Sequence, residues 1–447
     1  MQHNPAETPS PSLDVVAEAI NRIASSGWDR LSAQLQQTGG CARPIRLKGG
    51  VRAVDLTTGE LSVAYDSAAE PDGVLLKSCQ ARRSTVCPAC AAVYKGDARQ
   101  LILAGLTGGK GVTAEVLSRP LVFATLTAPS FGPVHTGHDE DRLCHPGHVH
   151  CPCGEEHWCL GVHRPGDPYI GTPICPSTYD YVGTVVWNNR VGELWRRTLI
   201  AARRRLARHL RVPVRSFGDS YRLAYLKVIE YQERGVVHVH ALVRLDPAPE
   251  SSDGPEFVDT GHLVVAVTEA AHHVLAPNPV EPSVLVRWGP QNRVDPVSLD
   301  GRRHLASYLA KYTTKSVGYG GAMDHRLDAG GVRNLQAPDH LKRLVQAAWD
   351  LGRQPALAAY HFQEWAHTLG YRGHWMTKSP NWSTTLGALR QARQQYRSGS
   401  SNEPPDRAEI KEWAYAGSGH VSAGDEWLAA TIHASRQANR RARWEEQ

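Results

Sequence analysis

The stretch LAYLKVIEYQERGVVHVHALVRL, residues 223–245, decides the fold of this chain. Two runs rich in apolar and β-branched residues, 223–232 and 236–245, flank the short glycine-containing segment 233–235. This pattern is typical of two antiparallel strands joined by a tight turn, because β-branched side chains suit a pleated sheet and glycine permits the turn conformation. The stretch therefore predicts a β-hairpin.

Two histidines in the second run, His238 and His240, carry the sharpest chemical signal. Side chains alternate along a strand, so the two imidazoles share one face while Val239 between them points into a core. A three-residue turn places Glu230 about opposite His238 on the partner strand. Such a set can chelate a divalent cation, and we expect Mg²⁺ or Mn²⁺, although the pattern alone does not separate these from other divalent ions. The alternative is two surface histidines on an amphipathic strand.

A second signal is the segment YLAKYTTK, residues 308–315. In a helix, Tyr308 and Tyr312 are four residues apart and share one face, with Lys315 next to them. A tyrosine hydroxyl beside a bound metal can attack a phosphodiester, which leaves a covalent phosphotyrosine and a free 3′-hydroxyl. A nearby lysine and the metal would both favour the phenolate. The predicted catalytic residues are Tyr312, Tyr308 and Lys311, the lysine directly before Tyr312. The alternative is an amphipathic helix whose tyrosines only pack.

The nine cysteines gather in two groups, which favours metal ligation over disulfides in a reducing compartment. The first group predicts a structural four-thiolate zinc site made of Cys41, Cys79, Cys87 and Cys90. The second lies in an irregular segment, 135–180, that is also rich in histidine. Cys144 and four histidines lie among them, and Cys151, Cys153, Cys159 and Cys175 can make a second structural Zn²⁺ site. Buried or free cysteine is the alternative for both groups.

Composition and charge limit the kinds of partner that the chain can bind. It has 447 residues, 41% of them hydrophobic, and a formal net charge of +6. Basic residues concentrate between 190 and 215, and the predicted DNA contacts are Arg196, Arg197, Arg203 and Arg204. The alternative is a solvated helix whose arginines pair with acids elsewhere. No apolar stretch is long enough for a membrane span and no secretory signal is evident, so we expect a cytoplasmic protein without a membrane partner.

The remaining elements suggest four consecutive parts. We expect helices over 13–35, 97–106, 184–211 and 302–315, and a buried strand beginning at Leu121. The predicted parts are a helical and cysteine-rich segment (1–118), a sheet-containing domain with the 135–180 insertion (119–330), a helical region (331–397), and a linker with a polar helical tail (398–447). In the helical region, Trp375, Trp382 and Arg372 can stack on unpaired bases, with core packing as the alternative for the tryptophans.

Three motifs in order, FATLTAPSFG (123–132), HVHALV (238–243) and YLAKYTTK (308–315), resemble those of HUH rolling-circle replication initiators. More narrowly, the chain resembles the RepSA-type initiators of actinobacterial plasmids and integrative elements. Four further blocks extend the likeness over most of the chain: CARPIRLKG (41–49), CPACAAVYKGDA (87–98), GTPICPSTYDYVGTVVWNN (171–189) and HWMTKSPNWSTTLGALR (374–390).

The resemblance implies an α+β fold of the HUH endonuclease type, with a five-stranded antiparallel sheet flanked by helices and the HVH strand at its centre. It implies that His238 and His240 bind the metal and that Tyr312 is the nucleophile. Some plasmid initiators have glutamate four residues before the nucleophile; here that residue is Tyr308, as in two-tyrosine phage initiators. The partners it implies are single-stranded and duplex origin DNA, a host helicase and the replication machinery.

Two other functions fit parts of the sequence. A two-tyrosine HUH transposase shares the HxH and YxxxY motifs, but the insertion and the block at 374–390 favour an initiator. A zinc-stabilised DNA-binding regulator without catalysis explains the cysteines and arginines, and leaves the histidine and tyrosine motifs as coincidence.

Overall fold

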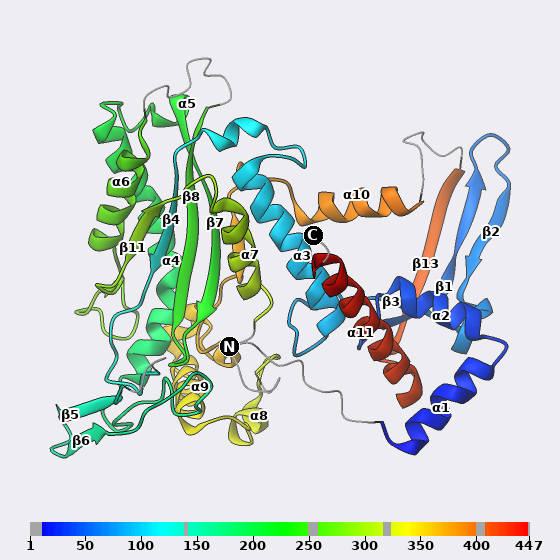
Figure 1. Ribbon diagram of the computed structural model, residues 1–447, viewed down its shortest axis with the longest axis horizontal. Coiled ribbons are helices and arrows are strands. Elements are labelled where there is room, and N and C mark those ends of the chain that lie inside the picture. Colours follow the sequence, from blue (N-terminus) through cyan, green and yellow to red (C-terminus); the bar gives the residue numbers. More distant parts are fainter. Residues whose placement is uncertain (1–10, 138–141, 249–257, 316–322, 399–406, 446–447) are drawn as a thin grey trace. The chain divides into compact units, whose positions relative to one another are not determined.

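The computed structural model describes residues 11–137, 142–248, 258–315, 323–398 and 407–445 (Figure 1). The chain divides into two compact units. The first unit runs from Ala98 to Thr385, and the second combines the N-terminal residues up to Asp97 with those from Leu386 onwards. Described residues before Ala98 and after Thr385 therefore belong to one unit, which differs from the four consecutive parts expected from sequence.

The first unit contains most of the helices and strands. Its strands are β4 (Leu121–Leu126), β5 (His145–His150), β6 (Glu156–Cys159), β7 (Tyr221–Tyr231), β8 (Val237–Pro247), β9 (Leu275–Ala276), β10 (Val286–Arg287), β11 (Arg293–Pro296) and β12 (Met376–Lys378). Its helices are α4 (Tyr181–His209), α5 (Phe217–Ser220), α6 (Thr260–His273), α7 (Arg302–Tyr312), α8 (Ala329–Arg333) and α9 (Asp339–Gly352). Helix α3 (Pro88–Thr107) begins in the second unit and ends in the first.

A five-stranded antiparallel sheet organises the first unit, in the order β11-β4-β8-β7-β12. The predicted hairpin is confirmed: β7 and β8 pair along their whole lengths, and the turn closes with Gln232 N donating to Val236 O at 2.9 Å. The register pairs Glu230 with His238, as the turn length predicted. Strand β8 is the central strand, since it lies between β4 and β7.

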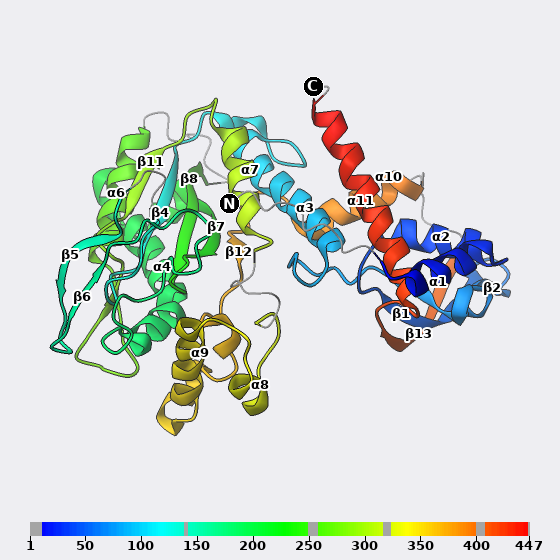
Figure 2. The same ribbon diagram turned by 60° about the horizontal axis from the view of Figure 1, so that its bottom comes forward.

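The two faces of this sheet have different partners. Alternate residues of β4 and β8, such as Ala124, Val239 and Ala241, are fully buried in one hydrophobic core with residues of α4 and α6. The intervening residues, including Phe123 and His240, point to the opposite face, where they meet α7. Strand alternation therefore places both histidines of β8 on the α7 face. Helices α8 and α9 lie together at one end of the sheet in Figure 2.

Several helices differ in extent from the sequence-based expectation. The expected helix over 13–35 is two helices, α1 (Leu13–Ala24) and α2 (Trp28–Gln37), because the backbone is extended at Ser25. Helix α3 begins at Pro88, before the expected position 97. Helix α7 ends at Tyr312, where the hydroxyl of Thr313 donates to Ala310 O at 2.8 Å. No helix among the described residues is both long and apolar enough to cross a membrane.

The second unit has its own antiparallel sheet, in which β1 (Ile45–Asp55) pairs with β2 (Leu61–Asp66), β3 (Leu75–Lys77) and β13 (Arg407–Ser418). Strand β13 corrects the expectation of a linker followed only by a helical tail. The backbone of β13 pairs along a long register with β1, which lies far away in the sequence. A local sequence pattern does not reveal such a partner. The remaining helices are α10 (Leu386–Ser398) and α11 (Ala423–Glu445). Most of the expected linker, 399–406, lies outside the described residues.

Candidate active site

The predicted metal ligands and tyrosines meet on the α7 face of the sheet. The ring centroids of His238 and His240 are 4.7 Å apart. The ring of Tyr312 stacks on His240 at 5.3 Å, and Tyr308 meets Tyr312 edge-on at 5.0 Å. The two tyrosines share a helix face, as their four-residue spacing predicted. Segments far apart in sequence thus form one cluster of aromatic and imidazole rings.

Glu230 joins this cluster from β7. Its Oε2 lies 3.4 Å from His240 Nε2, and its Oε1 accepts a hydrogen bond from Lys315 Nζ at 2.8 Å. Burial alone would raise the pKa of the Glu230 carboxyl, but the bonds from His240 and Lys315 outweigh burial and hold that pKa below its ordinary value. A carboxylate, two imidazoles and a bound ammonium therefore share a small, partly buried space.

The electrostatics of His238 suit a metal ligand. Burial and then the neighbouring His240 ring lower the pKa of His238 to about 4, so its imidazole is neutral near pH 7. The neutral form is the one that binds metals. Its Nδ1 is buried and has no hydrogen-bond partner among the residues that the structure describes. An orphaned, neutral ring nitrogen beside a second imidazole and a carboxylate fits a divalent cation.

The two tyrosines differ in environment. Tyr312 is 7% exposed, whereas Tyr308 is 42% exposed. Burial, followed by hydrogen bonding to Tyr308 and the nearby Glu230 carboxylate, raises the pKa of Tyr312 above its ordinary value. This opposes the expectation that a neighbouring lysine favours the phenolate. The side chains around Tyr312 therefore favour its neutral form.

The lysine beside the tyrosines is Lys315. Its Nζ lies 4.7 Å from the ring centroid of Tyr312 and also bonds Glu230. Lys311, the predicted catalytic lysine, is exposed on α7, one position before Tyr312 and therefore turned about 100° from it around the helix axis. The structure thus assigns the close contacts to Lys315, and a catalytic role for Lys311 stays a prediction without a described contact to support it.

Sequence reasoning missed two residues that position the cluster. Phe123 of β4 stacks on His240 with ring centroids 5.7 Å apart. Arg302, at the start of α7, is 3% exposed and donates hydrogen bonds to the carbonyl oxygens of Leu106, Val116 and Leu117. Phe123 was visible within the FATLTAPSFG motif. Arg302 carried no signal, because its partners are backbone atoms distant in sequence.

The first cysteine group is brought together in the second unit as predicted. Sγ of Cys41 lies 3.8 Å from Sγ of Cys87 and 3.6 Å from Sγ of Cys90. Cys79 completes the group, and all four sulfur atoms lie within 4.8 Å of one another. Backbone N–H groups of Ala42 and Cys90 point at Cys87 Sγ from 3.4 Å, an arrangement that stabilises thiolate charge. The donor set suits tetrahedral zinc.

The cysteines of the insertion are divided differently from the expected set. Cys151, Cys153 and Cys175 lie together, but their fourth neighbour is His157. Cys159 belongs instead to another group, with His135, Cys144 and His163. Within each group, the ligand atoms lie within 4.8 Å of one another. Among the described residues, three groups are this compact, and all three contain cysteine. His238, His240 and Glu230 form a looser set.

The predicted DNA-binding arginines lie on α4. Arg196 and Arg197 both bond the carboxylate of Glu193, at 2.8 and 2.6 Å. This acid lies on the same helix, whereas the solvated-helix alternative expected partners elsewhere in the chain. Arg203 lies over the ring of Phe217 at 5.6 Å, and Arg204 is exposed. Contact between these arginines and phosphate remains a prediction.

The two tryptophans of the 374–390 block are core residues. Trp375 is 6% exposed and Trp382 is fully buried, with the Arg244 guanidinium 4.9 Å from its ring centroid. The idea that they stack on unpaired bases is therefore wrong, because their faces are covered by protein. Arg372 is exposed and donates to Ala359 O at 3.1 Å.

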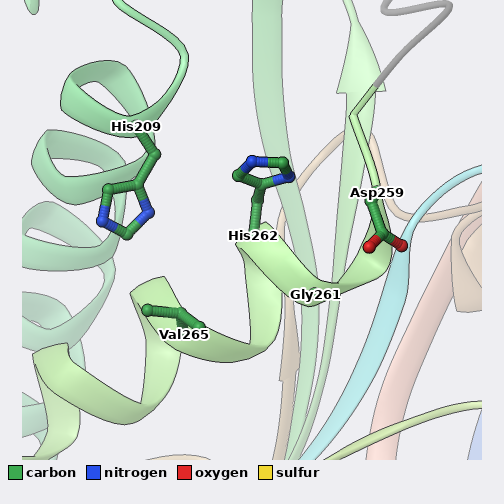
Figure 3. A pocket seen from close by; sticks show the side chains of 5 residues that line it. All are labelled: His209, Asp259, Gly261, His262 and Val265. Carbon is green, nitrogen blue, oxygen red and sulfur yellow. The ribbon is translucent and has the colours of Figure 1, made fainter.

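A hollow lies apart from the active-site cluster, between the C-terminal end of α4 and the N-terminal end of α6 (Figure 3). Its lining includes His209, His262 and Asp259, and the two histidine rings are 6.4 Å apart. None of the residues that line it belongs to the cluster around His238 and His240. The hollow and the candidate active site are thus separate features of the first unit.

Comparison with known proteins agrees with the motifs. The RepSA family, described as the replication initiator protein of pSAM2, matches residues 27–434. A curated replication initiator protein from Streptomyces ambofaciens is 40% identical over 444 residues, covering 94% of this chain and 93% of the relative. No solved structure matches the chain. Since both matches extend over nearly its whole length, the chain belongs to the RepSA family of replication initiator proteins.

Proposed function

We propose that this initiator nicks one DNA strand at its origin by tyrosine transesterification, on a domain of the HUH endonuclease type. The observation that carries the proposal is the stacking of Tyr312 on His240, with Glu230 and Tyr308 against the same rings. A central HVH strand in a five-stranded antiparallel sheet supports the HUH assignment. Family membership supports origin DNA as the substrate.

In the proposed reaction, the hydroxyl oxygen of Tyr312 attacks a backbone phosphorus. The bond between phosphorus and the 3′-oxygen of the preceding nucleotide breaks, and that oxygen takes up a proton to become a 3′-hydroxyl. The tyrosine proton leaves to solvent, so the number of phosphoester bonds is unchanged and the strand can later be rejoined. The free 3′-hydroxyl serves as the primer for rolling-circle replication.

The residues around Tyr312 divide the remaining work. His238, His240 and Glu230 would hold a divalent cation, for which Mg²⁺ or Mn²⁺ is proposed. When bound, such an ion polarises the phosphate and favours the phenolate. His240 also holds the Tyr312 ring by stacking, and Lys315 adds positive charge over that ring. Tyr308, which is more exposed on the same helix face, is proposed to act in a second round of strand transfer.

The proposal is tested by the polarity of the covalent product. Single-stranded fragments tiled across the DNA that the initiator replicates are labelled at one end and incubated with the full chain and Mn²⁺. A 5′-phosphotyrosine keeps the downstream fragment, so 3′-end label should migrate with the protein while 5′-end label leaves as a shorter free strand. Absence of any adduct on every fragment would favour a non-catalytic DNA-binding initiator.

Lys315 should matter more than Lys311. Replacing Lys315 by alanine removes the ammonium that bonds Glu230 and lies over the Tyr312 ring, and we expect about a tenfold to hundredfold slower nicking. Lys311→Ala is the matched control, because it removes the same charge from an exposed position of α7. Nicking rates on supercoiled origin plasmid measure both variants. A larger loss for Lys311→Ala would restore the original assignment.

The four cysteines of the second unit are proposed to bind one structural zinc. Replacing Cys87, which is fully buried, by serine should remove one zinc equivalent and destabilise the unit by several kilocalories per mole, because metal binding and folding are coupled. Ser84→Ala is the control, since Ser84 is exposed three residues earlier. Zinc analysis of purified protein with thermal denaturation checks the prediction. An unchanged zinc content in Cys87→Ser would contradict it.

A further inference from the structure

The insertion between β4 and α4 contains a group of four side chains that the motifs did not identify. His135 Nδ1 lies 3.1 Å from His163 Nε2, which is 3.3 Å from Cys159 Sγ. Cys144 Sγ lies 3.8 Å from His135 Nδ1. In tetrahedral zinc sites the Zn–S and Zn–N bonds of about 2.3 and 2.0 Å put neighbouring ligand atoms about 3.3–3.8 Å apart. These separations are close to that pattern.

The hydrogen bonds of His163 support a ligand role. Its Nδ1 lies 2.8 Å from the Asp167 carboxylate, whose other oxygen accepts from Tyr169 N at 2.8 Å. A carboxylate accepts only, so Nδ1 carries the proton in the neutral ring and Nε2 presents its lone pair to the other three groups. A carboxylate behind a histidine is the usual outer partner of a metal-bound imidazole. His163 is also 7% exposed, so the lone pair is shielded from water.

We propose that His135, Cys144, Cys159 and His163 bind a zinc ion of their own. This site is distinct from that of Cys151, Cys153, His157 and Cys175, because the two groups share no ligand. Strand β6 contributes His157 to one group and Cys159 to the other, and two residues of a strand span about 7 Å. The three cysteine-containing groups together use all nine cysteines, which argues for three closed sites and no free thiol.

The site also connects the insertion to the proposed active site. The backbone of His135 pairs with the segment 171–172, with Gly171 N donating to His135 O at 2.9 Å. Gly171 rests on the turn of the β7–β8 hairpin, where a Cβ on it would come within 2.4 Å of Glu233 and 2.5 Å of Arg234 backbone atoms. That hairpin carries Glu230 and His238. Zinc at His135 would therefore steady the turn that holds the proposed metal ligands in register.

The experiment counts zinc in the full chain, purified without added metal. We expect three equivalents in the unmodified protein and two in His163→Ala. His163→Cys replaces one zinc ligand by another and should keep three. His145→Ala is the matched control, because His145 Nδ1 lies 3.1 Å from Cys144 Sγ but His145 is outside the group. It should also keep three.

Hydrogen exchange gives a second readout that does not depend on nicking. Amides of the turn at 232–236 should exchange faster in His163→Ala than in His163→Cys or His145→Ala. The proposal is overturned if His163→Ala retains the zinc of the unmodified protein, or if His145→Ala loses an equivalent and His163→Ala does not. Failure of the nicking proposal leaves these measurements unaffected, since they use protein without DNA.

Discussion

Replacing Tyr312 by phenylalanine is expected to abolish the covalent protein–DNA adduct, with a loss of initial cleavage of about three orders of magnitude or more. The change removes only the hydroxyl that forms the bond to phosphorus. The ring, which stacks on His240 and is 7% exposed, keeps its packing, so no cavity forms. Loss of one buried hydroxyl should cost about 1 kcal/mol of stability, far too little to explain a loss of that size.

Tyr308→Phe is the matched control for this variant, because it makes the same change one helical turn earlier on the same face. We expect it to form the adduct at a near-normal rate but to fail in completing strand transfer. Gel detection of the adduct, with the modified residue identified by mass spectrometry, reads both steps. If Tyr308→Phe loses the adduct and Tyr312→Phe forms it, the proposed reaction stands and the two tyrosines exchange roles. Wild-type adduct formation by both variants would rule out the tyrosine mechanism.

Removing the histidine pair should have a similarly large effect. His238→Ala and His240→Ala are each expected to reduce nicking by at least about a hundredfold, because each deletes a proposed ligand of the ion that polarises the phosphate. Duplex DNA binding should persist, since the proposed phosphate contacts lie on α4. Nicking of supercoiled origin plasmid is measured across a Mn²⁺ titration, and binding is measured separately by gel shift.

The result for His240→Ala is harder to interpret, because His240 is 4% exposed and its ring packs between Phe123 and Tyr312. His240→Ala leaves a cavity there and is expected to lower the melting temperature. Glu230→Gln avoids this difficulty because it keeps the side-chain volume and changes only the charge. It should lose nicking with little change in melting temperature. Full nicking by unmodified protein in the presence of EDTA would contradict a metal role for all three residues.

Sequence reasoning was most successful where the pattern was local. The alternation of residues 223–245 and the length of the turn predicted both the hairpin and the pairing of Glu230 with His238. The spacing of Tyr308 and Tyr312 predicted their shared helix face. It did not decide between base stacking and core packing for Trp375 and Trp382, because an aromatic residue looks the same in sequence whether it covers a base or fills a core; the structure buries both.

By itself, the sequence determined the local geometry of each element: strand alternation put His238 and His240 on one face, and helical periodicity aligned the tyrosines. Only the tertiary structure decided which face of the sheet α7 covers and which lysine reaches Glu230. It also decided that Cys159 lies in one ligand group with His163 and not in the group of Cys175. Likewise, β13 finds its partner β1 at the other end of the chain. These contacts join residues distant in sequence, and their formation depends on the packing of whole elements, which no local periodicity encodes.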